Sequence, residues 1–410
     1  MKKISFILFI LIFSIGKAAT IQVGANFSIK KIKQALLLAN DGDTIIVHSG
    51  IYKEGTILID KKIFFIGINF PVLDGQSKKE VLSINANDVV VKGFKVINSG
   101  HAALDDPCGI RVYDKNNVII QGNILDNNFF GIYLQNSTNC VVKNNSIKAY
   151  GKAEQLIGNG IHCWKSSNLQ IIGNTINGHR DGIYFEFVTQ SVIWRNIASN
   201  NIRYGLHFMF SNDDAYITNV FKNNGAGVAV MFTKNVKMFN NYFEENWGDS
   251  AYGLLLKEIS DSYIFNNRFA RNTSGIYMEG TSRIKVEKNL FESNGWGMKI
   301  QASCMENEIV NNNFLKNTFD ISTNGSLVLN TFNANYWDKY EGYDLNKDGM
   351  GDVPYHPLSL FAVLTENTPS AMLLYRSFMI TLLDKSEKVL PSITPDNFVD
   401  NKPLMKSLPL

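Results

Sequence analysis

Histidine and methionine side chains recur at fixed positions in the middle of the chain. Met209 and Met231 stand 22 residues apart, and His207 precedes Met209 by two residues. If 22 residues make one turn of a coil, the two methionines lie on adjacent strands about 4.8 Å apart, with His207 on the same face. Thioether sulfur and imidazole nitrogen together suit Cu(I). We therefore predict a transient copper contact at these residues and no tightly bound cofactor; the alternative is that they pack beneath a covering loop.

Aromatic and acidic residues occupy equivalent positions in neighbouring segments of the chain. Tyrosine and tryptophan rings stack on sugars or peptides, while carboxylates fix the polar groups of a ligand. A ligand-binding face is therefore predicted at His162, Trp164, Tyr184, Glu186, Tyr277 and Glu279. Glu186 and Glu279 are four turns apart, roughly 19 Å, which is too far for them to act as one pair of catalytic acids.

An acidic segment near the C-terminal end has the spacing of an oxygen-ligand loop. Residues 344–352 read D-x-N-x-D-G-x-x-D, which places oxygen atoms on alternate residues and a glycine at the sharp turn. The pattern predicts a structural calcium ion held by Asp344, Asn346, Asp348 and Asp352. The alternative is a turn cluster without an ion, because the glutamate expected at the twelfth position is Tyr355.

A repeated segment must position most of these side chains. Between residues 109 and 297 a glycine followed by alternating apolar and polar residues returns at steps of 22, 29, 22, 23, 22, 26, 22 and 22 residues. Asparagine stands fourteen residues after each glycine, at Asn123, Asn145, Asn174, Asn196, Asn219, Asn241, Asn267, Asn289 and Asn311. This period, in segments rich in Val, Ile, Phe and Tyr, predicts an all-β fold: a right-handed parallel β-helix of about 22 residues per turn.

The register of the repeat assigns the faces of the predicted coil. Residues one and three after each glycine are apolar and point inward, so the residues two and four after it point outward. The copper and ligand candidates all hold outward positions. Every insertion falls between an asparagine and the next glycine, so the inserted loops are expected along one edge of a single sheet. The asparagines are expected to stabilise the turns by hydrogen bonds to the backbone and to each other.

The first nineteen residues have the composition of a secretory signal. Lys2 and Lys3 precede the apolar run 4–15, and small residues follow up to Ala19. Residues 1–19 are therefore predicted to be a signal peptide that is removed on export. Without its three lysines the formal net charge falls from +3 to about 0. This balance argues against nucleic acid or an anionic membrane as the main partner.

The remaining chain divides into four predicted segments. Residues 20–43 form an N-terminal helical cap, and the β-helix occupies 44–332. An acidic aromatic loop follows at 333–358. Residues 359–410 hold a helix, at 370–390, and an extended tail, which either close the end of the coil or dock on a partner.

The cysteines are predicted to be free thiols. Cys163 and Cys304 stand six turns apart, roughly 29 Å, which a disulfide cannot span. Cys108 and Cys140 stand at different offsets from their glycines and so on different faces.

Catalytic motifs are not found in the sequence. It contains no H-E-x-x-H segment, no nucleophile elbow and no Ser, His, Asp order of a catalytic triad. The chain is therefore predicted not to be an enzyme. A carbohydrate-binding or carbohydrate-cleaving β-helix is the alternative, and it rests on fold analogy alone.

Several segments resemble one family of periplasmic proteins. They are RDGIYFEF (180–187), RYGLHFMFSND (203–213), GAGVAVMFTKNV (225–236), AYGLLLKE (251–258), GIYMEG (275–280), KIQASCM (299–305), NYWDKYEGYDLNKDG (335–349) and MLLYRSFMITLLDKSEKVLP (372–391). Together they resemble the NosD family, the periplasmic maturation proteins of nitrous oxide reductase. Single β-helix turns are unspecific, but an acidic loop joined to a C-terminal helix is far more diagnostic.

The resemblance implies an accessory role without catalysis. Proteins of this family act in the periplasm with an ABC-type permease and its ATPase, with nitrous oxide reductase and with a copper-donating lipoprotein. Together they build the copper-sulfur centre of the reductase. The resemblance implies that the C-terminal helix and tail dock on the permease, which provides the only membrane association, and that the outer sheet face receives the reductase or its copper source. It supplies no catalytic residues.

Overall fold

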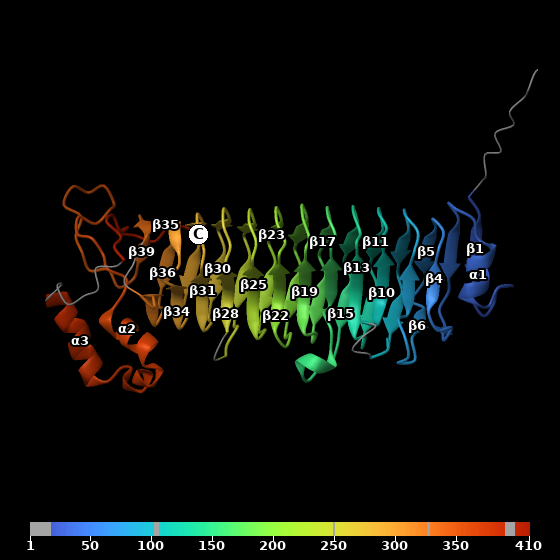
Figure 1. The fold of residues 1–410 in the computed structure, drawn as a ribbon, viewed down its shortest axis with the longest axis horizontal. Helices are drawn as coiled ribbons and strands as arrows, with labels where there is room; N and C mark the ends of the chain where they lie inside the picture. The colour runs from blue at the N-terminus through green and yellow to red at the C-terminus, as the bar shows by residue number, and fades with distance from the viewer. Residues whose placement is uncertain (1–17, 102–105, 249–250, 326–328, 390–397) are drawn as a thin grey trace, which may run out of the picture.

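Three parallel sheets run the length of the molecule and enclose one core (Figure 1). The computed structural model describes residues 18–101, 106–248, 251–325, 329–389 and 398–410. The predicted signal peptide, apart from its last two residues, lies outside the described residues. Within them the sheets contain 14, 13 and 12 strands, here named sheets A, B and C. The prediction of a parallel β-helix is confirmed.

Apart from the first and last turns, each turn of the coil contributes one strand to each sheet in a fixed order. Sheet A contains β1 (Thr20–Val23), β2 (Thr44–Val47), β5 (Phe64–Gly67), β8 (Val90–Lys92), β11 (Ile119–Gln121), β14 (Val141–Lys143), β17 (Gln170–Ile172), β20 (Val192–Trp194), β23 (Ala215–Ile217), β26 (Lys237–Phe239), β29 (Tyr263–Phe265), β32 (Lys285–Glu287), β35 (Met305–Val310) and β38 (Leu329–Asn333). Sheet B contains β3 (Ile51–Tyr52), β6 (Val72–Asp74), β9 (Lys95–Ile97), β12 (Ile124–Asp126), β15 (Ser146–Lys148), β18 (Thr175–Asn177), β21 (Ile197–Ser199), β24 (Val220–Lys222), β27 (Tyr242–Glu244), β30 (Arg268–Ala270), β33 (Leu290–Glu292), β36 (Asn313–Leu315) and β39 (Tyr336–Trp337). Sheet C contains β4 (Ile57–Ile59), β7 (Leu82–Ile84), β10 (Cys108–Tyr113), β13 (Phe130–Gln135), β16 (Ile161–Trp164), β19 (Asp181–Glu186), β22 (Tyr204–Met209), β25 (Ala226–Met231), β28 (Tyr252–Lys257), β31 (Ser274–Glu279), β34 (Trp296–Ile300) and β37 (Phe319–Ser322).

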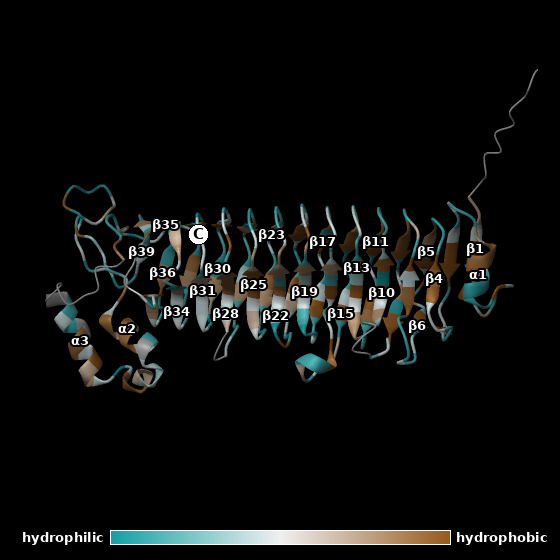
Figure 2. Cartoon of the chain, viewed as in Figure 1, coloured by the Kyte–Doolittle hydropathy of each residue, from teal (hydrophilic) through white to brown (hydrophobic). Residues whose placement is uncertain are grey.

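Apolar side chains stack in columns inside the coil. One column is aromatic and continues from Phe243 through Phe269, Phe291 and Phe314 to Trp337. Ring centroids are 4.6 Å apart between Phe243 and Phe269 and 4.2 Å apart between Phe314 and Trp337. All five side chains are buried. The turns along the upper edge are hydrophilic in Figure 2, as expected for segments that face water.

A ladder of buried asparagines follows one corner of the coil, as predicted. Asn174 accepts hydrogen bonds from the backbone N–H and the side-chain amide of Asn145, both at 3.0 Å. Its own amide donates to Oδ1 of Asn196 and to the carbonyl of Val142, both at 2.9 Å. The same pattern links the predicted asparagines from Asn123 to Asn289. The column therefore stabilises the turns rather than binding a ligand.

The prediction of Asn311 as the last asparagine of this ladder is wrong by one residue. Asn289 donates to Asn312, not to Asn311. The extra residue lies between Ile300 and Met305, because Ile300 pairs with Met278, 22 residues earlier, whereas Met305 pairs with Ser282, 23 residues earlier. Asn311 has a φ of 56° and takes the left-handed position that precedes the ladder residue.

A second buried asparagine ladder was not predicted from the sequence. It follows the corner between sheets B and C, where each asparagine but the last donates to Oδ1 of the asparagine in the next turn, from its side-chain amide or, at Asn224, from its backbone N–H. Its members are Asn201, Asn224, Asn246, Asn272, Asn294 and Asn317. Five of the six stand nineteen residues after their glycines and Asn317 stands twenty after its glycine, so counting from the glycines could have found this column as well.

The insertions lie at the corner between sheets B and C, as predicted. The longest complete one, residues 149–159, connects β15 to β16 and contains the short helix η1 (Glu154–Leu156). It projects from the lower edge of the coil in Figure 1. The insertions before β10 and β28 also follow a sheet B strand and precede a sheet C strand.

The coil begins earlier than predicted. Strand β1 pairs in parallel with β2, so the segment 20–43 contains the first strand of sheet A as well as a helix. That helix, α1 (Ile32–Leu38), closes the end of the coil with buried Ile32 and Ala35. Its first two backbone N–H groups donate to the carboxylate of Glu54 in the next turn, at 2.8 and 3.0 Å.

The C-terminal region departs from the prediction in two ways. Strand β39 extends the coil to Trp337, beyond the predicted boundary at 332. Three helical segments replace the single helix at 370–390: α2 (Leu360–Asn367), η2 (Pro369–Leu374) and α3 (Phe378–Val389). The break falls at Arg376, which has a left-handed φ of 63°. No helix in the described part of the chain is long and apolar enough to cross a membrane.

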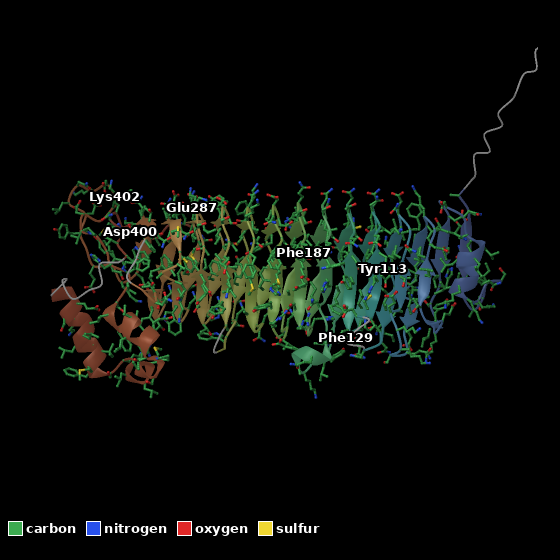
Figure 3. The ribbon with its side chains drawn as sticks, viewed as in Figure 1. Tyr113, Phe129, Phe187, Glu287, Asp400 and Lys402 are labelled. Atoms are coloured by element: carbon green, nitrogen blue, oxygen red, sulfur yellow. The ribbon has the colours of Figure 1, made fainter. Side chains whose placement is uncertain are left out.

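The C-terminal tail returns to the end of the coil rather than docking on the helices. The buried carboxylate of Asp400 (Figure 3) accepts hydrogen bonds from the backbone N–H groups of Ala334 and Asn335 and from Nε1 of Trp337, at 3.0–3.1 Å. Asp400 also accepts from the amide of Asn335, the last ladder asparagine, at 3.0 Å. The carboxylate of Asp400 therefore accepts the hydrogen bonds that the ladder asparagine of a further turn would accept. Backbone hydrogen bonds of 2.9 Å in both directions join Asp400 to Tyr355. Tyr355 precedes α2 and Asp400 follows α3 in the chain, so these bonds join the segments on either side of the helices.

Candidate functional site

Three columns of side chains form the outer face of sheet C. Two are the predicted columns at two and four residues after each glycine. The third is the residue before each glycine, which strict alternation would place inside. In β19, Asp181 pairs in register with Tyr204, and a Cβ on Gly182 would lie 2.5 Å from the carbonyl oxygen of Gly205. The glycine therefore lets adjacent turns approach closely and brings Asp181 onto the outer side.

The column two residues after glycine points outward, but the prediction that it is exposed is wrong. His162, Tyr184 and His207 are only 9%, 9% and 6% exposed. Ring centroids are 4.4 Å apart between Tyr133 and His162, 4.8 Å between His162 and Tyr184, and 5.0 Å between Tyr184 and His207. Four rings on four consecutive strands thus cover one another. Burial lowers the pKa of His162 to about 3, so this imidazole is neutral at physiological pH.

The predicted ligand-binding residues fall into two groups. His162 and Trp164 on β16 pair in register with Tyr184 and Glu186 on β19. Glu186 accepts a hydrogen bond of 3.3 Å from the hydroxyl of Tyr184.

The second group is separate from the first. Tyr277 and Glu279 are on β31, with three strands of sheet C between β31 and β19. Glu279 forms an ion pair of 3.3 Å with Lys257. The structure therefore brings together four of the six residues, and two of those four have buried rings.

His207 faces a buried carboxylate. Its Nδ1 lies 3.5 Å from Oδ2 of Asp181, close enough for an ion pair but without the geometry of a hydrogen bond. Two guanidinium nitrogens of Arg203 donate to this carboxylate, at 2.9 and 2.5 Å. Burial opposes ionisation of Asp181, but Arg203 and His207 outweigh it, so the pKa of Asp181 lies below its ordinary value. Neither ring nitrogen of His207 has a hydrogen-bond partner among the described residues.

Met209 and Met231 lie beside this histidine. They pair in register on β22 and β25, and both are half-buried. Tyr184 contacts the group at two points: its ring meets the ring of His207 edge-on, and its hydroxyl lies 3.9 Å from Sδ of Met209. The structure therefore brings the three predicted copper contacts to one place.

The donor set at this place fits a soft cation. It consists of two thioethers and an imidazole nitrogen without a hydrogen-bond partner. Within the described ranges no group of three or more His, Cys, Asp or Glu residues could hold a metal ion. A site here therefore depends on the methionines, as the sequence predicts.

Three phenylalanines beside the methionines were missed by the sequence analysis. Phe187, Phe210 and Phe232 stand five residues after their glycines and stack with ring centroids 5.2 and 5.1 Å apart. Their φ angles are 53°, 51° and 54°, a left-handed conformation that bulky residues rarely adopt. Phe187 and Phe210 are exposed (Figure 3 labels Phe187). We call this group the phenylalanine strip; strained, exposed aromatic residues point to an interaction surface.

The acidic loop is held by its own backbone. The carboxylate of Asp344 accepts a hydrogen bond of 2.9 Å from the N–H of Gly349, and the carboxylate of Asp352 accepts one of 2.6 Å from Leu345. Asp348 likewise accepts from the backbone within the loop. These carboxylates thus accept hydrogen bonds from the loop's own backbone, and the calcium ion stays a prediction.

All four cysteines are buried free thiols, as predicted. Cys108 lies in the outer column, where its sulfur is 3.4 Å from Nε of Arg111. Burial raises the pKa of the Cys108 thiol to about 12, which keeps it protonated and unreactive.

Comparison with solved structures agrees with the fold. A tailspike protein, Dettilon gp208, has a TM-score of 0.56 and 12% identity over 73% of this chain and 66% of its own. The catalytic unit of an α-1,3-glucanase from Streptomyces thermodiastaticus has a TM-score of 0.56 and 13% identity over 75% of this chain and 64% of its own. PfbA, a surface adhesin of Streptococcus pneumoniae, has a TM-score of 0.51 and 13% identity over 72% and 88%. At such identities the likeness shows the fold alone.

Sequence comparison gives more specific matches. A protein of Stutzerimonas stutzeri named "Probable ABC transporter binding protein NosD" is 31% identical over 113 residues, which are 27% of this chain and 26% of the relative. A protein of the same name from Pseudomonas aeruginosa is 30% identical over a segment of the same length. The aligned segment is thus about a quarter of the length of these relatives.

A family profile covers much more of the chain. The profile described as "Periplasmic copper-binding protein (NosD)" matches residues 38–152 and 148–342, which include nearly the whole coil, the candidate copper contacts and the start of the acidic loop. On this match, the chain belongs to the NosD family of periplasmic copper-binding proteins.

Proposed function

We propose that this protein is a periplasmic accessory protein that works with an ABC-type permease and its ATPase to assemble the copper-sulfur centre of nitrous oxide reductase. It binds the reductase or its copper-donating lipoprotein and does not itself catalyse a reaction. The observation that carries this proposal is the family match across residues 38–342. The names of the two relatives, ABC transporter binding proteins, support the link to a transporter.

Copper is the proposed cargo, and His207, Met209 and Met231 are its proposed contacts. Two thioethers and one imidazole favour Cu(I) over harder ions. The three side chains share one face of β22 and β25, and both methionines reach the surface. The phenylalanine strip borders the methionines and offers the apolar area that a docked protein would cover.

The C-terminal helices are the proposed docking surface for the permease. Helix α2 is fixed to the coil by an ion pair of 3.0 Å between Lys299 and Glu366 and by packing of Phe361 on Phe319. Beyond it, η2 and α3 carry large apolar side chains on the outside, visible as brown segments in Figure 2. Leu373 and Phe378 are 89% and 82% exposed. An apolar group of this kind marks a contact surface.

Polar substitution of this surface is expected to release the protein from the permease. We predict that the double variant F378S/M379S loses co-purification with the permease, because both side chains are exposed and their apolar area no longer contributes to binding. The control is L37S on α1, which replaces an equally exposed leucine at the opposite end of the coil. Equal recovery of the permease with both variants would contradict this docking surface.

The acidic loop is proposed to hold a structural calcium ion through Asp344, Asn346, Asp348 and Asp352. The expected result is that calcium raises the thermal midpoint of unfolding by binding the folded state only. The variant D344N/D348N should abolish this rise, because it removes two negative charges from the proposed ligands. Differential scanning calorimetry with calcium and with a chelator measures the effect. No shift of the wild-type midpoint would show that the loop is an ion-free turn.

The experiment that tests the proposed function is deletion of the gene in its source organism, followed by assay of nitrous oxide reduction. Loss of activity that returns with the wild-type gene supports the maturation role. Retained activity would exclude it, and a glycan-binding screen of the outer face would then test the carbohydrate alternative.

A further inference from the structure

We propose that Asp181, held in place by Arg203, is a positioning residue that orients His207 as a metal ligand. The carboxylate faces Nδ1 of His207 and favours a proton on that nitrogen. Nε2 is then left with a free lone pair for a soft cation such as Cu(I). This inference rests on the proposed function insofar as it takes His207 to be a copper contact.

The first support is the rigidity of the carboxylate. Asp181 is fully buried, and Arg203 holds both of its oxygens with two parallel hydrogen bonds. The backbone N–H of Tyr204 adds a third hydrogen bond, of 3.3 Å, to Oδ1. Oδ2 retains capacity to accept, and Nδ1 of His207 is the nitrogen that lies 3.5 Å from it.

The second support is the surroundings of the imidazole. The rings of Tyr184 and Tyr204 lie 5.0 and 4.9 Å from the ring of His207, and Ala229 is its register partner on the next strand. Nε2 is buried and has no hydrogen-bond partner among the described side chains and backbone. A buried polar nitrogen without a partner is unfavourable, and a bound cation removes that penalty. In metal sites the ligating histidine commonly donates its other N–H to a carboxylate.

The third support is the contrast with His162, two strands away in the same column. Its Nδ1 lies 3.0 Å from the amide nitrogen of Asn159. The amide oxygen of Asn159 is occupied by Nε of Arg180, at 3.2 Å, so the NH₂ group must face His162. Nδ1 of His162 is therefore an acceptor, and the proton of this neutral imidazole is on Nε2. The two histidines hold opposite tautomers, and only that of His207 leaves Nε2 free to bind a metal.

This contrast defines an isosteric test, D181N. The amide oxygen of the new side chain should take the place of Oδ1, where Nε of Arg203 and the N–H of Tyr204 donate. Its NH₂ group then takes the place of Oδ2, loses the hydrogen bond from the second Arg203 nitrogen and faces His207, as the amide of Asn159 faces His162. The proton of His207 should then move to Nε2. We predict that D181N weakens Cu(I) binding 10- to 100-fold, which is the range typical for loss of such a partner. The affinity is measured anaerobically by competition with the chelator bicinchoninate, and H101A, which removes an exposed histidine that follows β9, is the control, expected to bind as the wild type does.

A second measurement needs neither copper nor a variant. Nitrogen-15 NMR of the copper-free wild-type protein should show His207 with its proton on Nδ1 and His162 with its proton on Nε2. In D181N the His207 signals should change to the pattern of His162. His207 protonated on Nε2 in the wild type, or unchanged copper affinity in a folded D181N, would overturn the proposal. If instead the NMR result holds and H207A binds copper normally, the positioning is correct and the proposed copper contact is wrong.

Discussion

The triple variant H207A/M209A/M231A is expected to lose Cu(I) binding and the ability to mature the reductase. It removes two thioethers and one imidazole, and the described His, Cys, Asp and Glu residues form no group of three or more that could hold the ion instead. The affinity should fall by more than about a hundredfold, because each ligand contributes at least as much as a supporting partner does. Chelator competition measures the affinity, and reductase activity in the complemented deletion strain measures maturation.

The matched control for the triple variant removes the same chemical groups elsewhere on the coil. H101A/M305A deletes an exposed histidine that follows β9 and an exposed methionine on β35. This control should retain both copper affinity and maturation. Full maturation by the triple variant, with a wild-type unfolding curve, would show that copper does not pass through these residues.

The second large effect is expected from the asparagine ladder. We predict that N174A lowers the free energy of unfolding by roughly 3 kcal/mol, because several buried hydrogen-bonding groups lose their partners at once. Asn174 accepts from two groups of Asn145 and donates to Asn196 and Val142. Urea denaturation followed by circular dichroism measures the loss, with the slope of the transition as a check that unfolding remains cooperative.

The adjacent residue supplies the control for the ladder. Thr175 is exposed in the same turn, so T175A should change the free energy of unfolding by less than about 1 kcal/mol. If N174A were as stable as T175A, the ladder would not be a main source of stability, and apolar stacking alone would hold the turns together.

The periodic part of the fold could be predicted because each turn repeats the same physical requirements. Adjacent turns approach so closely at the glycines that a Cβ on Gly227 would lie 2.3 Å from the carbonyl oxygen of Gly253. At the next corner, the side-chain oxygen of Asn267 accepts a hydrogen bond from the buried backbone N–H of Asn241 in the turn before it. Requirements that recur in every turn leave a period in the sequence, which is why the sheets and the first asparagine ladder were found.

Features that depend on one turn or on distant segments left no such period. One extra residue between Ile300 and Met305 moves the ladder from Asn311 to Asn312, and counting from a glycine does not detect it. Asp400 ends the ladder from a position 65 residues beyond Asn335, so no local pattern reveals it. Such contacts are set by packing at the end of the coil, where no further turn follows.

The candidate site was found only in part for the same reason. Alternation along the strand identifies His207 and Met209 as outward residues, and the period aligns Met231 with them. Simple alternation along the strand would also assign Asp181 to the core. It fails there because Gly182, the next residue, lets adjacent turns approach closely and brings Asp181 to the outer side. The carboxylate beside His207 therefore appears only when the strands are placed in space.

The most direct test of the maturation role is the composition of the reductase made without this protein. Nitrous oxide reductase would be purified from the deletion strain and from the strain complemented with the wild-type gene, and its copper and sulfide would be quantified. We predict that enzyme from the deletion strain folds but lacks its copper-sulfur centre, and that complementation restores the centre. A full complement of copper and sulfide in the reductase of the deletion strain would contradict the maturation role.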